Sequence, residues 1–273
     1  MLEVILDKIS GFIAGRLKRQ TSGYEPFTPS DPATLLRTLQ PGDVLLVEGN
    51  QKVSAAIKYL TQSTWSHAAI YVGDVGLVDA ATGEPSRLIE VNLGEGVVAS
   101  PLSKYATYNT RICRPVGLSD AVRQTIVDYC VKRIGNKYDT RNILDLARYL
   151  LPTPPVPIRW RRRMIALGSG DPTREICSTL IALAFQKVKY PILPLLMDGG
   201  EALRVRSYYS QNEMLHIRHH SLFTPRDFDV SPFFNIVKPT VEHGFDYKML
   251  RWGNEDGHSE HAPSEITGKK GKN

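Results

Sequence analysis

Cysteine is scarce in this sequence. The 273 residues include Cys113, Cys130 and Cys177, an odd number at wide spacings with no Cys-x-x-Cys pair. This pattern predicts neither a disulfide framework nor a cysteine zinc site, and it fits a reducing compartment best. The three histidines at positions 216, 219 and 220 match no common ligand spacing either, so we expect no metal and no cofactor.

Long apolar runs are missing as well. No stretch approaches the roughly 20 apolar residues that a membrane-spanning helix needs. The first 19 residues carry Glu3 and Asp7 and lack an uninterrupted apolar centre, so they do not predict a signal peptide. We therefore expect a cytoplasmic protein without a membrane span.

The first residues instead predict an amphipathic helix. Apolar residues recur at helical spacing on one face, and basic residues gather at its end. The apolar positions are Leu2, Ile5, Leu6, Ile9, Phe12, Ile13 and Leu17, and the basic positions are Arg16, Lys18 and Arg19. Two interpretations stay open: the helix packs on the domain or on a second subunit, or it lies on an anionic surface at the inner face of the membrane.

The net charge is mildly basic, at +6 for pH 7. Such a charge attracts anionic surfaces weakly but selects no partner, and we expect no specific nucleic acid. The basic run Arg159-Trp-Arg-Arg-Arg163 is typical either of a solvated loop or of a phosphate-binding segment. The oligomeric state stays open.

Length and composition favour one main domain. With 42% apolar and 23% charged residues, the chain can bury one sizeable core. We expect an amphipathic helix and linker at residues 1–38 and the domain at residues 39–240, with a Pro- and Arg-rich insertion at about 151–170. Residues 241–273 form an extension that we expect to be disordered from about residue 253.

Within the domain, the pattern predicts an α+β fold with runs of antiparallel strands. Short apolar segments bounded by Gly, Pro or Ser predict strands, and helical periodicity behind capping residues predicts helices. Strands are expected within 40–48 and at 67–72, 88–92, 97–99 and 110–115; helices are expected at 31–39, 52–62, 119–135 and from about 173. Residues 224–234 predict two capped turns. Runs of strands without regular strand-helix alternation favour the α+β class.

One cysteine differs from the others by its position. Cys177 lies within about the first turn of the apolar helix that the segment Glu175–Phe185 predicts, and His67 begins a strand. A thiol at a helix N-terminus feels the positive end of the helix dipole, and a nearby imidazole can take its proton. This pairing indicates covalent catalysis, whereas Cys113 and Cys130 are typical of inert core residues.

Six segments together resemble a known family. They are Pro41-Gly-Asp-Val44, Ser66-His-Ala-Ala-Ile-Tyr-Val-Gly73, Leu88-Ile-Glu-Val91, Gly135-Asn-Lys-Tyr138, Ile176-Cys-Ser-Thr-Leu-Ile181 and Thr224-Pro-Arg-Asp-Phe228. In this order they resemble the circularly permuted NlpC-type papain-like cysteine hydrolases, the YiiX/YebB-like branch, across roughly residues 39–239. The resemblance implies a permuted papain-like α+β fold, in which an antiparallel sheet or partial barrel packs against the helix with the cysteine.

The resemblance also implies roles for individual residues. Cys177 is expected to be the nucleophile, with its backbone N–H donating to the developing oxyanion, and His67 the general base. Glu90 is expected to orient the imidazole, with Asp79 as the alternative. Tyr138 is expected to line the substrate pocket.

Three classes of function follow from this resemblance. A hydrolase of amide-type bonds in small peptide-like substrates is the leading hypothesis. A hydrolase of lipid esters or amides, or an acyltransferase, at a membrane surface is the alternative. A non-catalytic binding module that kept the fold is the third, and the presence of the cysteine, the histidine and an acid argues against it.

The membrane interpretation leads to a test. Deleting Met1–Gln20 is expected to reduce sedimentation with anionic liposomes and to leave Cys177 reactive, because each basic residue near an anionic surface contributes about 1 kcal/mol and the apolar face adds its own burial. Raising the salt concentration should weaken any remaining binding. A full-length protein that ignores anionic liposomes at low salt would make the helix a packing or dimer element.

Overall fold

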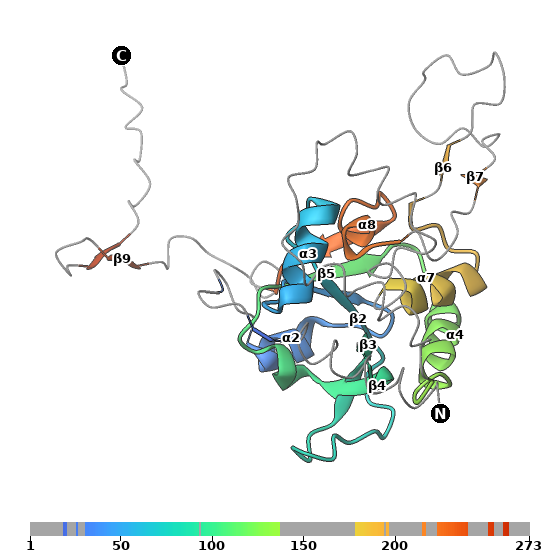
Figure 1. Ribbon diagram of the computed structural model, residues 1–273, viewed down its shortest axis with the longest axis horizontal. Helices are drawn as coiled ribbons and strands as arrows, with labels where there is room; N and C mark the ends of the chain where they lie inside the picture. The colour runs from blue at the N-terminus through green and yellow to red at the C-terminus, as the bar shows by residue number, and fades with distance from the viewer. Residues whose placement is uncertain are drawn as a thin grey trace, which may run out of the picture. The chain divides into compact units, whose positions relative to one another are not determined.

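We analysed a computed structural model of the chain (Figure 1). It describes residues 19–20, 26, 31–92, 94–136, 178–193, 195–196, 215–216, 223–239, 251–253 and 259–261. The chain divides into two compact units, Met1–Val237 and Lys238–Asn273. No helix in these described segments is long and apolar enough to cross a bilayer.

The first unit is built on a six-stranded antiparallel sheet with the strand order β4-β3-β2-β1-β5-β8. The strands are β1 (Val44–Val47), β2 (His67–Tyr71), β3 (Ser86–Asn92), β4 (Gly96–Pro101), β5 (Thr110–Pro115) and β8 (Phe234–Val237). β4 and β8 are the two edges, so the described sheet is open. The α+β class is confirmed. Of the two arrangements that the resemblance implied, an antiparallel sheet or a partial barrel, the described strands form an open antiparallel sheet.

Five α-helices and one 3-10 helix accompany this sheet in the described segments. They are α2 (Pro32–Thr38), α3 (Lys52–Thr61), η1 (Leu102–Tyr105, the 3-10 helix), α4 (Asp120–Val131), α7 (Ser178–Lys187) and α8 (Pro225–Asp229). α2 begins where Asp31 accepts a hydrogen bond from Thr34 N at 3.0 Å. α4 follows Ser119 as expected but ends at Val131, before Gly135, which has a φ of +86°.

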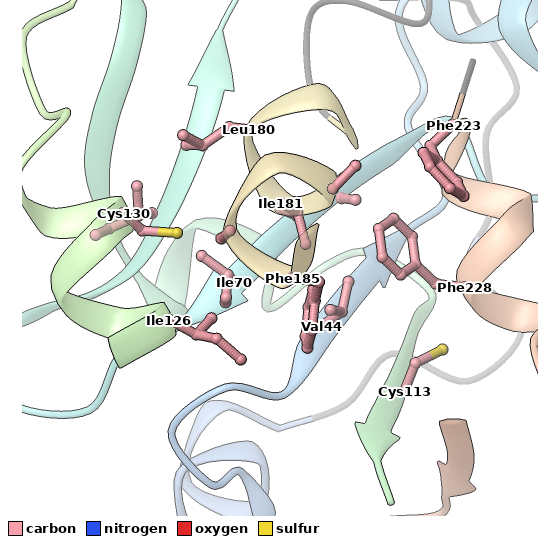
Figure 2. Packing of buried hydrophobic residues seen from close by; sticks show 14 of the residues in the cluster. Val44, Ile70, Cys113, Ile126, Cys130, Leu180, Ile181, Phe185, Phe223 and Phe228 are labelled. Carbon is pink, nitrogen blue, oxygen red and sulfur yellow. The ribbon is translucent and has the colours of Figure 1, made fainter. Parts of the chain in front are cut away.

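Both faces of the central strands are buried. Alternate residues of β1 point to opposite faces, so Val44 and Leu46 join one apolar cluster, whereas Leu45 and Val47 join another. α4 and α7 cover the first face, on which Phe185 of α7 packs (Figure 2). α2 and η1 cover the second face. This double coverage explains why β1 is a continuous apolar run.

Most expected elements of residues 31–136 are present within one to three residues of their predicted ends. The capped turn at residues 224–229 is also present, as α8 with a capping box between Thr224 and Asp227. β8 was not predicted: it pairs with β5, but its two central residues, Asn235 and Ile236, are exposed, so the segment lacks an alternating pattern.

The remaining described segments form two short pairs of strands. β6 (Leu195–Leu196) pairs with β7 (Leu215–His216). In the second unit, β9 (Arg251–Gly253) pairs with β10 (Ser259–His261), and β10 lies in the stretch from about residue 253 for which we expected disorder. The expected N-terminal helix at residues 2–17, the insertion at about 151–170 and the helix start near residue 173 lie outside the described residues.

Candidate active site

β2 begins at His67, as the sequence predicted. The residue pairs with Val47 of β1, and the turn before it is held by a hydrogen bond from Gly49 N to Ser66 Oγ at 2.9 Å. A Cβ atom at Gly49 would lie 2.3 Å from Ser54 Oγ, so a glycine is needed at this close approach. The His67 side chain is 20% exposed, so part of the imidazole is accessible to solvent.

The strand register brings Glu90 to His67. Glu90 of β3 lies opposite Ala69, two residues from His67 and therefore on the same face of the sheet. Its side chain reaches diagonally to the histidine, and 2.5 Å separate Glu90 Oε2 from His67 Nε2. The Glu90 side chain is fully buried, at 0% exposure.

The carboxylate of Glu90 has three further partners from β4 and η1. Ser100 Oγ donates to Oε1 at 2.5 Å, and Lys104 Nζ donates to the same oxygen. Tyr105 OH donates to Oε2, the oxygen that also faces His67. Each oxygen thus has two partners, which a buried carboxylate needs because water cannot solvate it.

These contacts determine the charge of Glu90. Burial alone would raise the pKa of Glu90, but hydrogen bonds and positive charge from His67 and Lys104 outweigh burial and hold the pKa well below its usual range. Glu90 is therefore an anion at neutral pH. An anionic carboxylate only accepts hydrogen bonds. Nε2 of His67 therefore carries the proton and donates a hydrogen bond to Oε2 of Glu90. Nδ1 is then the nitrogen that can take a proton in a reaction.

Two tyrosine rings also lie near the histidine. The centroids of the His67 and Tyr105 rings are 6.1 Å apart, and the ring of Tyr108 stands edge-on to that of Tyr105 at 5.8 Å. Tyr105 thus both packs beside the imidazole and donates to its carboxylate partner. The arrangement fixes the orientation of His67 from two directions.

Asp79, the alternative partner of the histidine, lies in a different environment. Its Oδ1 accepts hydrogen bonds from Ala81 N at 3.1 Å and from Thr82 N at 2.8 Å. Hydrogen bonds to the backbone and side chain of Thr82 lower the pKa of Asp79. All of its described hydrogen bonds lie within its own turn. The structure brings Glu90, and not Asp79, to His67.

Cys113 and Cys130 are fully buried in the first apolar cluster. Burial raises the pKa of both thiols, that of Cys130 to about 12. Neither residue is a thiolate at neutral pH, which is what inert core cysteines require.

Cys177 and Tyr138 lie outside the described residues. The helix that follows Cys177 is described from the next residue on: α7 begins at Ser178, whose Oγ donates to Phe223 O at 2.5 Å. α7 packs against β2 through Leu180, Ile181 and other apolar residues of its buried face. The helix adjacent in sequence to Cys177 therefore lies on the strand that carries His67.

Sequence reasoning missed the three partners that hold Glu90. Ser100 is a buried polar residue in a strand, and Lys104 and Tyr105 follow immediately after that strand. A glutamate inside the apolar strand Leu88–Val91 is itself a signal, because a buried carboxylate needs donors nearby. The sequence did not indicate which donors these are, because the answer depends on the register of β3 with β4.

No group of three His, Cys, Asp or Glu side chains that could hold a metal ion occurs within the described segments. Of the three histidines between residues 216 and 220, the described segments include the backbone of His216, in β7.

Comparisons with known proteins show what this chain is similar to. The model of one family, described as permuted papain-like amidase enzymes of the YaeF/YiiX, C92 family, matches residues 38–149. Over these residues the match confirms the resemblance inferred from the motifs. Among solved structures, the chain is similar to the metalloprotein YiiX from Escherichia coli O157:H7. The two are 18% identical, the match covers 74% of this chain and 97% of that chain, and the TM-score is 0.43. No curated protein matches the sequence.

The buried carboxylate predicts how acid affects stability. A lowered folded-state pKa means that Glu90 stabilises the fold above its ordinary pKa of 4.5, and that this contribution disappears as the pH falls further. Glu90→Gln is expected to lower the free energy of unfolding at pH 7 by about 1–3 kcal/mol, since it leaves Lys104 and His67 without their anion. It should also flatten the loss of stability below pH 4.5.

Urea unfolding between pH 7 and pH 2.5 measures both effects, and Asp79→Asn is the matched control. The pKa of Asp79 is also lowered, but its hydrogen bonds lie within an exposed turn where solvent screens the charge, so Asp79→Asn should flatten the slope less than Glu90→Gln. Equal slopes for Glu90→Gln and the wild type would contradict the charged, buried state of Glu90.

Proposed function

Since residues 38–149 match the model of the permuted papain-like amidase family, we propose that this chain is a cysteine hydrolase that cleaves amide-type bonds through an acyl-enzyme on Cys177. One observation carries the proposal: inside the matched segment, a buried anionic carboxylate contacts Nε2 of His67 at 2.5 Å. A histidine oriented in this way by an acid is what nucleophilic catalysis by a thiol needs.

In the proposed first step, the Cys177 thiol gives its proton to Nδ1 of His67, and the thiolate attacks the carbonyl carbon of the amide. The backbone N–H of Cys177, at the start of the helix, donates to the resulting oxyanion. When the oxyanion collapses, the carbon-nitrogen bond breaks. The proton on Nδ1 then moves to the leaving nitrogen, which departs as an amine and leaves a thioester on Cys177.

In the proposed second step, water hydrolyses the thioester. His67, now neutral at Nδ1, takes a proton from the water while the hydroxide oxygen attacks the thioester carbon. The carbon-sulfur bond breaks, a carboxylic acid leaves, and the proton returns to the sulfur. Throughout both steps Glu90 keeps the proton on Nε2, so Nδ1 is the nitrogen that exchanges protons.

The substrate that we propose is a small peptide-like molecule, with Tyr138 at its pocket. The alternative, a lipid ester or amide at a membrane surface, uses the same two steps with a different leaving group. Assays of amide release from short peptides and of acyl release from lipid esters, each with Cys177→Ala as the blank, separate the two substrate classes.

Labelling tests the nucleophile. Cys177→Ala is expected to abolish turnover and the fast reaction with iodoacetamide-type probes at pH 7. Cys113→Ala and Cys130→Ala should leave both largely intact, because burial raises the pKa of these two thiols and keeps probes out. Mass spectrometry of the folded protein after brief labelling identifies the modified cysteine. Labelling of Cys130 as fast as Cys177 would argue against a special thiolate at Cys177.

Kinetics test the orienting acid. Glu90→Gln is expected to lower kcat by about 10²–10⁴-fold, since an amide can offer Nε2 either of its two ends and no longer stabilises the imidazolium. Asp79→Asn should change kcat by less than about threefold. Circular dichroism establishes that both variants fold before the rates are compared. A larger loss in Asp79→Asn than in Glu90→Gln would transfer the orienting role to Asp79.

A further inference from the structure

Lys104 contacts the acid that faces His67. Its Nζ donates to Oε1 of Glu90, while Oε2 of the same carboxylate faces His67. The carboxylate therefore lies between the Lys104 ammonium and the His67 imidazole. The Lys104 side chain is 37% exposed, so its ammonium lies at the boundary between solvent and the buried carboxylate.

The short helix η1 fixes Lys104 at this point. On one side of Lys104, Ser103 Oγ donates to Glu84 and ties η1 to the turn before β3. On the other side, Tyr105 is buried and donates to Glu90. The ammonium also lies 5.4 Å from the centroid of the Tyr105 ring, a favourable position for a cation. Lys104 is thus held by its neighbours on both sides.

The charge of Lys104 affects what Glu90 can do for His67. A buried carboxylate in contact with an imidazole favours the imidazolium strongly, because little water screens the pair. If the imidazolium were favoured too strongly, the proton would stay on Nδ1 and would not pass to the leaving nitrogen. His67 would then also be unable to act as the base that hydrolyses the thioester. A cation on the other oxygen offsets part of the carboxylate charge while leaving the geometry of the contact unchanged.

We propose that Lys104 is a positioning residue of this site, which holds Glu90 by Oε1 and offsets its charge so that His67 can release its proton near neutral pH. The proposal rests on the proposed function for its consequence in catalysis. The link from Lys104 through Glu90 to His67 stands on the described contacts alone.

Few other described groups near this link change charge around neutral pH. The carboxylate of Glu90 faces His67 from β2, Ser100 from β4, and Lys104 and Tyr105 from η1. The acids near η1 are Glu84, bound to Ser103, and Asp79, whose pKa is lowered chiefly by its hydrogen bonds to Thr82. Of the side-chain types in this set, histidine is the one whose ordinary pKa lies between pH 5 and pH 9, so a transition in that range reports on His67.

Nuclear magnetic resonance titration of histidine side chains in the full-length chain tests the link without using activity. The chain has seven histidines, and a His67→Gln spectrum identifies the signal of His67. Lys104→Met is expected to raise the midpoint of the His67 titration by about one pH unit, because the carboxylate then acts with its full charge. Lys104→Arg keeps the charge and should stay near the wild type.

Lys58→Met is the matched control. Lys58 also pairs with a glutamate, at 3.2 Å from Oε1 of Glu48, and its side chain is similarly half-buried, so its loss removes the same charge without touching Glu90. We expect the His67 midpoint to move by less than about 0.3 pH unit in this variant. If Lys104→Met does not fold, Lys104→Gln is measured in its place.

Kinetics complete the test. The acid limb of the pH profile of kcat/KM, where protonated His67 no longer accepts the proton of the thiol, should move upward with the His67 midpoint in Lys104→Met and stay in place in Lys58→Met. An unchanged midpoint in folded Lys104→Met, an equal shift in Lys58→Met, or a Lys104→Arg variant that behaves like Lys104→Met would overturn the proposal. If Cys177→Ala retains full turnover while the midpoint moves as expected, the proposed function fails and the link from Lys104 to His67 stands.

Discussion

The structure of this site depends on keeping one carboxylate ionised inside the protein. Glu90 has no exposed surface, and an isolated anion in such a place would be costly by several kcal/mol. Four donors remove that cost, and they come from three different elements, β2, β4 and η1. The register of the antiparallel strands, the position of η1 and the orientation of His67 are all constrained by this single requirement. A shift of one residue in β3 would turn Glu90 to the opposite face, among apolar side chains.

The two faces of the sheet serve two different purposes. Glu90 and His67 lie on the face covered by α2 and η1, whereas α7 packs on the other face, against the residues that alternate with them. The helix is therefore anchored by apolar contacts that are separate from the polar network. A change in the core under α7 and a change around Glu90 should act on stability independently, because the described hydrogen bonds of Glu90 include no residue of the cluster under α7.

Much of this arrangement could be predicted from the sequence, and the exceptions have physical reasons. Local patterns predicted the ends of β2 and the presence of α4, because apolar periodicity and capping residues act over a few positions. Glu90 was predicted as the partner of His67 through a family resemblance, and the structure shows the contact directly. Lys104 and Tyr105 were missed, since their role follows from pairing between β3 and β4 and from the turn into η1. β8 was missed because an exposed edge strand needs little apolar pattern.

The order of the elements along the chain has a consequence for synthesis. His67, Glu90 and Lys104 lie within 40 residues of each other, on the neighbouring strands β2 and β3 and on η1, which follows β4, so they can assemble early as the chain leaves the ribosome. The helix α7, and Cys177 immediately before it, follow only much later. In the proposed assignment, a nascent or truncated chain contains the oriented base His67 but lacks the Cys177 thiol that it would deprotonate. Reactivity toward acyl groups then begins only when most of the domain has been made, which protects an incomplete chain from acylating itself or its neighbours.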